Sequence, residues 1–451
     1  MQKKNVVVLG AGLVGGAIAA DLADHFNVTA VDADPRALDR LKKKDGIKAV
    51  RADLSSAPAL RSAVAGADIV VGALPGSMGY RMLQTLAPEK KDIVDISFFA
   101  EDPFPLDELF RENGITVITD CGVAPGMGNI ILGHHNSTMV VDSYECYVGG
   151  LPVEREWPWE YRAVFSPMDV IEEYTRPARY VENGHLVERE ALSDPQLLYF
   201  KGIGSLEAWN SDGLRTLIKT IQVPNMIEKT LRYPGCIEYL RVLREAGFFS
   251  QDEVDVKGVK IRPVDLTASL LFPKWELKDG EEDFTVMRII VSGTRFPGEN
   301  SEDRLSGESD ADAGDEAPAA GDSATGAGDE APAAGKSAPD PASSGESPST
   351  GGGRVLVSGR MPPVTGETVP VEGRIKYTWE LLDRYERSTG TLSMARATGY
   401  TCTAAVHLLA RGMFTRKGLC PPEYLGEDRE NFRFIMKYLD ERGVRYRLEE
   451  S

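Results

Sequence analysis

The first 120 residues alternate short runs of apolar, often β-branched residues with segments whose apolar positions recur at helical spacing. The runs that predict strands are 5–9, 28–32, 47–51, 68–73, 92–96 and 115–119. Most of them are almost entirely apolar, which is typical of strands covered on both faces of a parallel sheet. Asp34 and Pro35 fit the N-cap and the first position of an intervening helix. Six strands joined by single helices predict a doubly wound α/β domain over residues 1–124.

The pattern changes after about residue 140, where strands and helices are mixed. The predicted strands are 144–148, 259–266, 284–291 and 374–379. Ser166-Pro167-Met168-Asp169 has the form of a capping box with a proline at the helix start. We therefore expect a second, α+β domain for substrate binding and dimerisation, formed by 125–297 and 354–392. From Ser393 the apolar spacing is helical again, and 393–451 is expected to return to the first domain.

The net charge of −18 is concentrated in one segment. Between Glu299 and Glu346 the chain has thirteen acidic and two basic residues, a charge of −11, which leaves −7 for the rest. This segment is rich in Gly, Ala, Ser and Pro and repeats an eight-residue sequence at 314–321 and 328–335. It cannot bury enough apolar surface to fold, so we expect disorder over 298–353. It is either a solubilising or tethering arm or an insertion tolerated in a surface turn.

The remaining composition excludes several classes of protein. The acidic balance argues against nucleic acid as a partner. No apolar run approaches the ~20 residues of a membrane span, and residues 1–4 lead into the first strand without an apolar leader, so we expect a cytoplasmic protein with no membrane partner. Five widely spaced cysteines without a C-x-x-C pair predict reduced thiols. His134-His135 lacks a second ligand pair, so no metal site is predicted.

A glycine-rich loop, Gly10-Ala11-Gly12-Leu13-Val14-Gly15, directly follows the first strand and opens a helix. In this context the first glycine permits the tight turn, the second lets a pyrophosphate approach the backbone, and the third allows close helix packing. Asp32 ends the second strand, where a carboxylate accepts hydrogen bonds from both ribose hydroxyls and repels a 2′-phosphate. The loop predicts a Rossmann fold that binds NAD. Because Arg36 lies nearby, NADP is possible as well.

The carboxyl ends of the six predicted strands should line one crevice, since ligands of doubly wound sheets bind at that edge. Asp53 is placed to meet the adenine, and Leu74-Pro75-Gly76 to pass under the ribose and nicotinamide. Asp95-Ile96-Ser97 and Asp120-Cys121-Gly122 then point toward the reacting end. The expected cofactor-binding residues are Gly10, Gly12, Leu13, Val14, Gly15, Asp32, Asp53, Leu54, Ala73, Leu74, Pro75 and Gly76.

Four ordered motifs resemble the saccharopine dehydrogenase family. They are Asp120 to Asn129, Leu206 to Leu217, Thr230 to Gly235 and Ser393 to Tyr400. The resemblance covers nearly the whole chain except the acidic segment. Fungal saccharopine reductases carry an Asn-Glu-Ile-Gly type of motif where this chain has Asp120-Cys121-Gly122, and this departure favours the lysine 6-dehydrogenase branch.

The resemblance implies that NAD(P) oxidises a carbon–nitrogen bond of a small, lysine-type amino acid. The substrate would be L-lysine, at its ε-carbon, or saccharopine, and the imine would hydrolyse to aminoadipate semialdehyde. The amine must lose a proton before hydride leaves, and Asp120, Asp95 and Cys121 are the candidate catalytic residues. Arg232 beside Tyr233 is the best match for binding the α-carboxylate. Ser97 and Gly122 complete the expected substrate contacts.

Two other functions share the cofactor site. A carboxy-polyamine (carboxynorspermidine-type) reductase would need an anionic pocket for a diamine. A nucleotide-responsive binding protein would retain the glycines and lack a functional base. Exposed sheet edges commonly pair across a two-fold axis, so we expect a homodimer.

Overall fold

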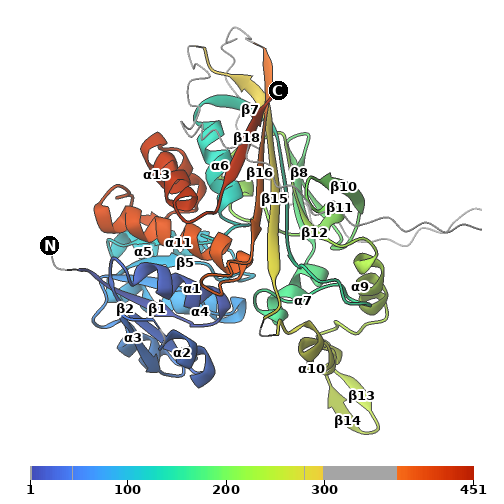
Figure 1. Cartoon of the computed structure of the whole chain (residues 1–451), viewed down its shortest axis with the longest axis horizontal. Coiled ribbons are helices and arrows are strands. Elements are labelled where there is room, and N and C mark those ends of the chain that lie inside the picture. The colour runs from blue at the N-terminus through green and yellow to red at the C-terminus, as the bar shows by residue number, and fades with distance from the viewer. Residues whose placement is uncertain (1–2, 43, 279, 298–372) are drawn as a thin grey trace, which may run out of the picture. The chain divides into compact units, whose positions relative to one another are not determined.

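The computed structural model describes residues 3–42, 44–278, 280–297 and 373–451. The predicted disordered segment 298–353 lies outside the described residues. The described residues belong to one compact unit, which contains two large sheets and a small two-stranded one (Figure 1). Among the described residues, no helix combines the length and apolar composition needed to cross a bilayer.

The first sheet has seven strands, all parallel, in the order β17-β6-β5-β4-β1-β2-β3. Its strands are β1 (Asn5–Leu9), β2 (Asn27–Asp32), β3 (Ile47–Arg51), β4 (Ile69–Gly72), β5 (Asp92–Asp95), β6 (Thr116–Ile118) and β17 (Gly418–Leu419). The six predicted strands are confirmed, and the order of the sheet reverses between β1 and β4, as in a doubly wound fold. The seventh, β17, comes from the C-terminal part of the chain and was not predicted.

Both faces of this sheet are covered, because successive strand residues point to opposite sides. Val6 and Val8 of β1 enter a core that includes Ile18, whereas Val7 and Leu9 enter a second core on the other face. The helices of this part are α1 (Leu13–Leu22), α2 (Pro35–Leu41), α3 (Ala57–Val64), α4 (Gly76–Leu86), α5 (Asp107–Glu112) and the 3₁₀ turns Ala87–Glu89 and Phe104–Leu106. The predicted N-cap is confirmed, since the Asp34 side chain accepts a hydrogen bond from the Arg36 amide at 2.9 Å.

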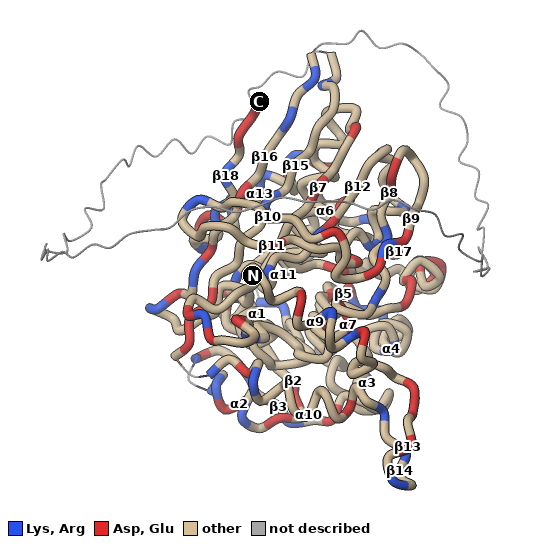
Figure 2. The backbone as a smooth tube through the Cα atoms, turned by 90° about the vertical axis from the view of Figure 1, so that its right-hand side faces the viewer, with Lys and Arg blue, Asp and Glu red and all other residues tan. Residues whose placement is uncertain are grey.

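The second sheet is mixed and has nine strands, with the main path β10-β11-β12-β7-β15-β16-β18. These strands are β7 (Met139–Pro152), β8 (Ala178–Glu182), β9 (His185–Arg189), β10 (Gln196–Phe200), β11 (Gly204–Asn210), β12 (Asn225–Arg232), β15 (Asp283–Arg295), β16 (Arg374–Arg384) and β18 (Tyr446–Glu450). Its helices are α6 (Met127–Asn136), α7 (Pro167–Thr175), α8 (Leu217–Thr220), α9 (Cys236–Glu245) and α10 (Pro263–Trp275). A small hairpin, β13 (Val254–Val256) and β14 (Val259–Ile261), projects from this part in both views (Figures 1 and 2). The α+β character of the second part agrees with the prediction.

Of two further expectations for the second part, one was wrong and one is confirmed. The predicted strand 259–266 is wrong beyond Ile261, because Pro263 takes the first position of α10 and the chain is helical from there. The predicted helix start at Ser166 is present, since its side chain accepts a hydrogen bond from the Asp169 amide at 3.5 Å.

The C-terminal segment joins the two sheets. It contains α11 (Ser393–Arg411), α12 (Glu423–Gly426) and α13 (Arg429–Asp440), and it also supplies β17 to the first sheet and β18 to the second. In Figure 1, α11 lies beside α1, and a Cβ on Gly399 would lie only 3.2 Å from the Ile18 side chain. The two helices therefore approach closely at this position, where a larger residue would have to displace the Ile18 side chain.

Asp21 of α1 ties the first domain to this segment. Its carboxylate accepts hydrogen bonds from Thr403 at 2.6 Å, Tyr438 at 2.5 Å and Arg442 at 2.6 Å. The Arg442 and Asp21 side chains are 18% and 11% exposed. Replacing Asp21 would remove the acceptor of the Tyr438 hydroxyl and of Arg442 Nε, whereas the Thr403 hydroxyl could still donate to the Tyr400 carbonyl at 3.2 Å.

Asp21→Ala should therefore lower the free energy of unfolding by about 3 kcal/mol, the cost of breaking a largely buried ion pair. Chemical denaturation measures this loss. Asp39→Ala is the control, because its pair with Lys42 is 62% and 68% exposed and should contribute less than about 1 kcal/mol. Equal losses in the two variants would contradict the role given to Asp21.

Candidate cofactor and substrate site

The glycine loop between β1 and α1 has the geometry of a pyrophosphate site. Gly10 has φ +99°, and a Cβ there would lie 2.2 Å from the Ala73 carbonyl oxygen. A Cβ on Gly15 would lie 2.2 Å from the carbonyl oxygen of Gly10. A Cβ on Gly12, in contrast, would meet no atom within 4 Å, and no side chain caps the first turn of α1. Two glycines are thus required by backbone packing, and the third leaves room where the helix N-terminus favours an anion.

Asp32 holds this loop from the end of β2. Its Oδ2 accepts a hydrogen bond from the Ala11 amide at 2.6 Å and its Oδ1 accepts one from the Asp34 amide at 2.8 Å. Each oxygen retains a lone pair for a ribose hydroxyl. Arg36 and Arg40 lie on the same rim and supply positive charge for a 2′-phosphate. The residues present therefore fit either NAD or NADP.

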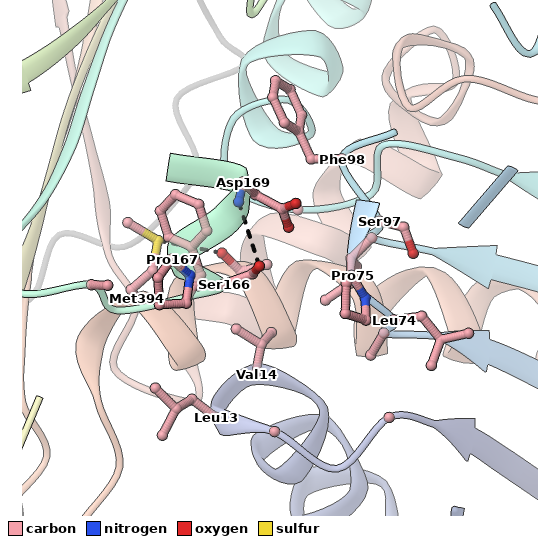
Figure 3. Close-up of a pocket in the computed structure, with 18 of the residues that line it drawn as sticks. Leu13, Val14, Leu74, Pro75, Ser97, Phe98, Ser166, Pro167, Asp169 and Met394 are labelled. Carbon is pink, nitrogen blue, oxygen red and sulfur yellow. Dashed lines mark hydrogen bonds between the residues drawn. The ribbon is translucent and has the colours of Figure 1, made fainter. Parts of the chain in front are cut away.

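A cavity of about 1200 Å³ runs from the glycine loop to the second sheet. Figure 3 shows Leu13 and Val14 at the start of α1 on one side and Asp169 at the start of α7 across from them. Leu74 and Pro75 follow β4 along a further wall. This volume exceeds the ~300–1,000 Å³ of a typical small-ligand site and is large enough for a ligand of dinucleotide size.

Most predicted site residues line this cavity. They are Gly10, Gly12, Leu13, Val14, Gly15, Asp32, Asp53, Leu54, Ala73, Leu74, Pro75, Ser97, Gly122 and Arg232. Gly76 lies just behind the wall, where its amide donates to Asp169 at 3.4 Å. The structure does not bring Asp95, Asp120, Cys121 and Tyr233 to the cavity surface.

Asp120 is buried because it forms an ion pair. Its two oxygens accept from Arg215 at 3.0 and 3.2 Å, and both side chains are under 5% exposed. Arg215 also donates to the Phe99 carbonyl. A carboxylate held in this way fixes an arginine and is not positioned to take a proton from a substrate.

Asp95 and Cys121 are also enclosed below the cavity. Asp95 accepts a hydrogen bond from the Ser97 hydroxyl at 2.9 Å, and burial raises its pKa to about 8, with the neighbouring Asp120 adding to the shift. Burial raises the pKa of the Cys121 thiol as well. The Cys121 Sγ lies 4.0 Å from the Thr401 carbonyl oxygen, against α11. Neither group faces the space where a substrate would bind.

Arg232 and Tyr233 were predicted as a pair, but they face different surroundings. Arg232 lines the cavity, is 2% exposed and pairs with Glu173 at 3.1 Å. Its guanidinium lies 4.4 Å from the centre of the Tyr161 ring. The Tyr233 hydroxyl instead donates to the Pro152 carbonyl at 2.9 Å, away from the cavity.

The second sheet also contributes carboxylates that the sequence did not single out. Glu228 and Arg232 lie four residues apart on β12, with Thr230 between them, so all three share one face and line the cavity. Burial raises the pKa of Glu228 to about 8, and the adjacent carboxylate of Asp212 adds to the shift. Burial raises the pKa of Asp169 to about 6 against the opposing hydrogen bond from Gly76. The alternation of side chains along β12 is the sequence signal that could have placed Glu228 on the same face as Arg232.

The predicted absence of a metal concerns His134 and His135. The His135 Nε2 accepts a hydrogen bond from the Trp379 indole at 2.9 Å, and the His134 ring stacks on Phe432 at 3.9 Å. Among the described residues, no group of three or more His, Cys, Asp or Glu could hold a metal ion.

The fold combines a Rossmann-like domain that carries the glycine loop with a second domain built on a mixed sheet. Residues 6–118 match the model for the saccharopine dehydrogenase NADP binding domain, and residues 122–444 match that for the saccharopine dehydrogenase C-terminal domain. The chain belongs to the saccharopine dehydrogenase family.

Individual relatives are more distant. The saccharopine dehydrogenase (NADP+, L-glutamate-forming) of Saccharomyces cerevisiae is 26% identical over 268 residues, covering 56% of this chain and 60% of the yeast protein. The carboxyaminopropylagmatine dehydrogenase of Synechocystis is 23% identical over 317 residues, covering 64% of this chain and 78% of that protein. The solved apo structure of saccharopine dehydrogenase from Saccharomyces cerevisiae superimposes with a TM-score of 0.67 at 18% identity, covering 99% of this chain and all of that one. The structural match shows the shared fold.

Gly12→Ala should raise the dissociation constant for NADPH at least tenfold, because the new Cβ enters the space left for the pyrophosphate. Its melting temperature should stay at the wild-type value, since that space is empty of protein atoms. Gly15→Ala is the contrast, because its Cβ meets the backbone at 2.2 Å and should lower the melting temperature. NADPH fluorescence titration and thermal denaturation measure both effects. Tight NADPH binding by Gly12→Ala would contradict this site.

Asp32→Ala should weaken NAD binding more than NADP binding, because it removes both the ribose acceptor and the charge that repels a 2′-phosphate. Isothermal titration with each dinucleotide measures the ratio. An equal loss for both would show that Asp32 acts only by holding the Ala11 amide.

Proposed function

We propose that this chain is an NAD(P)-dependent oxidoreductase that acts on the carbon–nitrogen bond of a lysine-type amino acid. The observation that carries the proposal is one cavity of about 1200 Å³ that joins the glycine loop to a wall of buried charged residues. Membership of the saccharopine dehydrogenase family supports the reaction class. L-Lysine, oxidised at its ε-carbon, and saccharopine are the proposed substrates, and aminoadipate semialdehyde is the product after hydrolysis of the imine.

The first domain places the cofactor. The bound nicotinamide supplies a hydride acceptor in the oxidative direction. The amides at the start of α1 bind the pyrophosphate, and Asp32 orients the ribose. Leu74 and Pro75 lie along the cavity on the path toward Ser97 and Gly122, so they exclude water from one side of the reacting end.

The second domain offers two arginines to a substrate carboxylate. Arg176 pairs with Glu172, and Arg232 pairs with Glu173. Arg176 Nη1 and Arg232 Nε are buried, and neither has a hydrogen-bond partner among the described residues. Both arginines line the cavity, so their positive charges would favour a substrate carboxylate bound beside them, as in an amino acid. This extends the expected role of Arg232 to a second arginine.

A carboxy-polyamine reductase is the second candidate. One relative of this chain, at 23% identity, is named carboxyaminopropylagmatine dehydrogenase. The second-domain wall also carries more carboxylates than arginines. Its acidic residues are Asp169, Glu172, Glu173, Asp212 and Glu228. A substrate with several cationic nitrogens would complement this excess.

Purified protein should form reduced cofactor, seen by absorbance at the nicotinamide band, with NAD or NADP and an amine substrate. L-Lysine and saccharopine are assayed in parallel with carboxynorspermidine. Turnover of L-lysine or saccharopine supports the first proposal, and turnover of carboxynorspermidine alone supports the second. Tight NADPH binding without turnover of L-lysine, saccharopine or carboxynorspermidine would contradict both proposed enzymatic functions. It would favour a nucleotide-responsive binding protein.

A further inference from the structure

Glu228 is a buried carboxyl group that reaches the substrate half of the cavity. It is 4% exposed and lies on the cavity-facing side of β12 with Thr230 and Arg232. Gly213 makes room for it, since a Cβ on Gly213 would lie 1.6 Å from Glu228 Oε1. Any residue other than glycine at 213 would displace this carboxyl group.

Glu228 differs from its acidic neighbours because it has no cationic partner. Its electrostatic neighbours are Asp212, Glu173, Asp120 and Arg215. Two N–H groups of Arg179 bind Asp212 at 2.8 Å each, Arg232 pairs with Glu173, and Arg215 pairs with Asp120. In the part of the chain that the structure describes, no group donates a hydrogen bond to the Glu228 carboxyl group or pairs with it.

An unpaired buried carboxyl group is costly to the fold. Transfer out of water disfavours its charged form, and only an opposite charge or hydrogen bonds offset this cost. Here no described group donates a hydrogen bond to it, and the nearby Arg215 is already paired with Asp120, whereas Asp212 and Glu173 each have an arginine partner of their own. A ligand in the cavity could therefore supply the positive charge that the Glu228 carboxyl group lacks.

We infer that Glu228 receives the cationic nitrogen of the substrate and accepts its proton in the oxidative direction. This inference rests on the proposed function and names the residue that the sequence did not reveal. The substrate would then span the cavity, with its carboxylate at Arg176 and Arg232 and its reacting amine at Glu228.

One N–H bond of the substrate ammonium breaks, and its proton forms an O–H bond on Glu228. The carbon–hydrogen bond next to the neutral nitrogen then breaks, and both of its electrons leave with the hydride to oxidised NAD(P), which is reduced. A carbon–nitrogen double bond forms, and the substrate is left as an iminium. In the reductive direction Glu228 returns the proton to nitrogen.

The surroundings of Glu228 give this step a pH dependence. Burial raises its pKa to about 8, Asp212, Glu173 and Asp120 add to the shift, and Arg215 opposes it. The free protein therefore holds the group largely protonated at pH 7. For wild type, kcat/KM in the oxidative direction should rise from pH 7 to pH 9 as the base ionises.

Glu228→Gln tests the inference, because it keeps the shape and removes the base. In the reaction that the wild type catalyses, kcat/KM should fall about a thousandfold. The rise between pH 7 and pH 9 should disappear, while the dissociation constant for NADPH stays within twofold. Glu182→Gln is the matched control, since Glu182 lies on the same sheet, is 40% exposed and pairs with Arg189. It should retain wild-type kinetics.

The melting temperature, measured as a function of pH, tests whether Glu228→Gln is folded and whether the Glu228 carboxyl group is buried in wild type. A carboxyl group whose pKa is raised in the folded state favours folding fully below its unfolded pKa, and this advantage is lost as pH rises toward 8. The melting temperature of Glu228→Gln should thus exceed that of wild type by a margin that grows from pH 5 to pH 8. A constant margin would contradict the buried, unpaired state.

The outcomes separate this inference from the proposed function. If wild type oxidises an amine and Glu228→Gln retains kcat/KM within threefold, the inference is overturned and the function stands. If wild type binds NADPH and oxidises none of the amines, the proposed function fails. Calorimetry with L-lysine and with carboxynorspermidine on the NADP-bound protein then decides whether Glu228 binds a cation. Binding lost in Glu228→Gln supports that role, and equal or absent binding in both proteins overturns it.

Discussion

The buried ion pair between Asp120 and Arg215 is the interaction on which the site depends. Asp120 lies just beyond the end of β6 in the Rossmann sheet, and Arg215 follows β11 of the second sheet. Breaking a buried pair costs roughly 3–5 kcal/mol, because the remaining charge is left without a partner. The pair therefore fixes the loop from Ser211 to Gly213 beside the carboxyl edge of the first sheet. The cavity wall is built on that loop and on β12.

The charges of the second-domain wall follow a simple pattern. Asp120, Asp212 and Glu173 each have an arginine, supplied by a different element of the chain. Glu228 lies among them without one. At the same time, Arg176 Nη1 and Arg232 Nε have no hydrogen-bond partner among the described residues. The wall thus combines an acidic position without a cationic partner with two arginines whose hydrogen bonds are incomplete, and the proposed amino-acid substrate would complement both.

The sequence predicted the structural features that depend on residues close together in the chain. The six strands, the cap at Asp34 and the glycine loop are local patterns of apolar spacing and backbone requirements, and the structure has all of them. The strand predicted through Leu266 failed because the apolar run continued past Pro263, which starts a helix. The two residues of β17 carry no signal of their own, since the strand exists only where the C-terminal segment meets β6.

The chemistry of the site depended on contacts that spacing does not show. Strand order placed Asp95, Asp120 and Cys121 at the correct edge of the sheet but gave no information on exposure. Asp120 became an ion-pair partner because Arg215, 95 residues later, lies against it. The sequence did not indicate Glu228, because its distinguishing feature is that it has no arginine partner while Asp120, Asp212 and Glu173 nearby each have one.

The most direct test of this account is a crystal structure of the protein with bound NADP. The account predicts the pyrophosphate on the first amides of α1, with the nicotinamide beside Ser97 and Gly122 and facing the Glu228 carboxyl group across the substrate space. A dinucleotide bound elsewhere, or a nicotinamide turned away from β12, would contradict it.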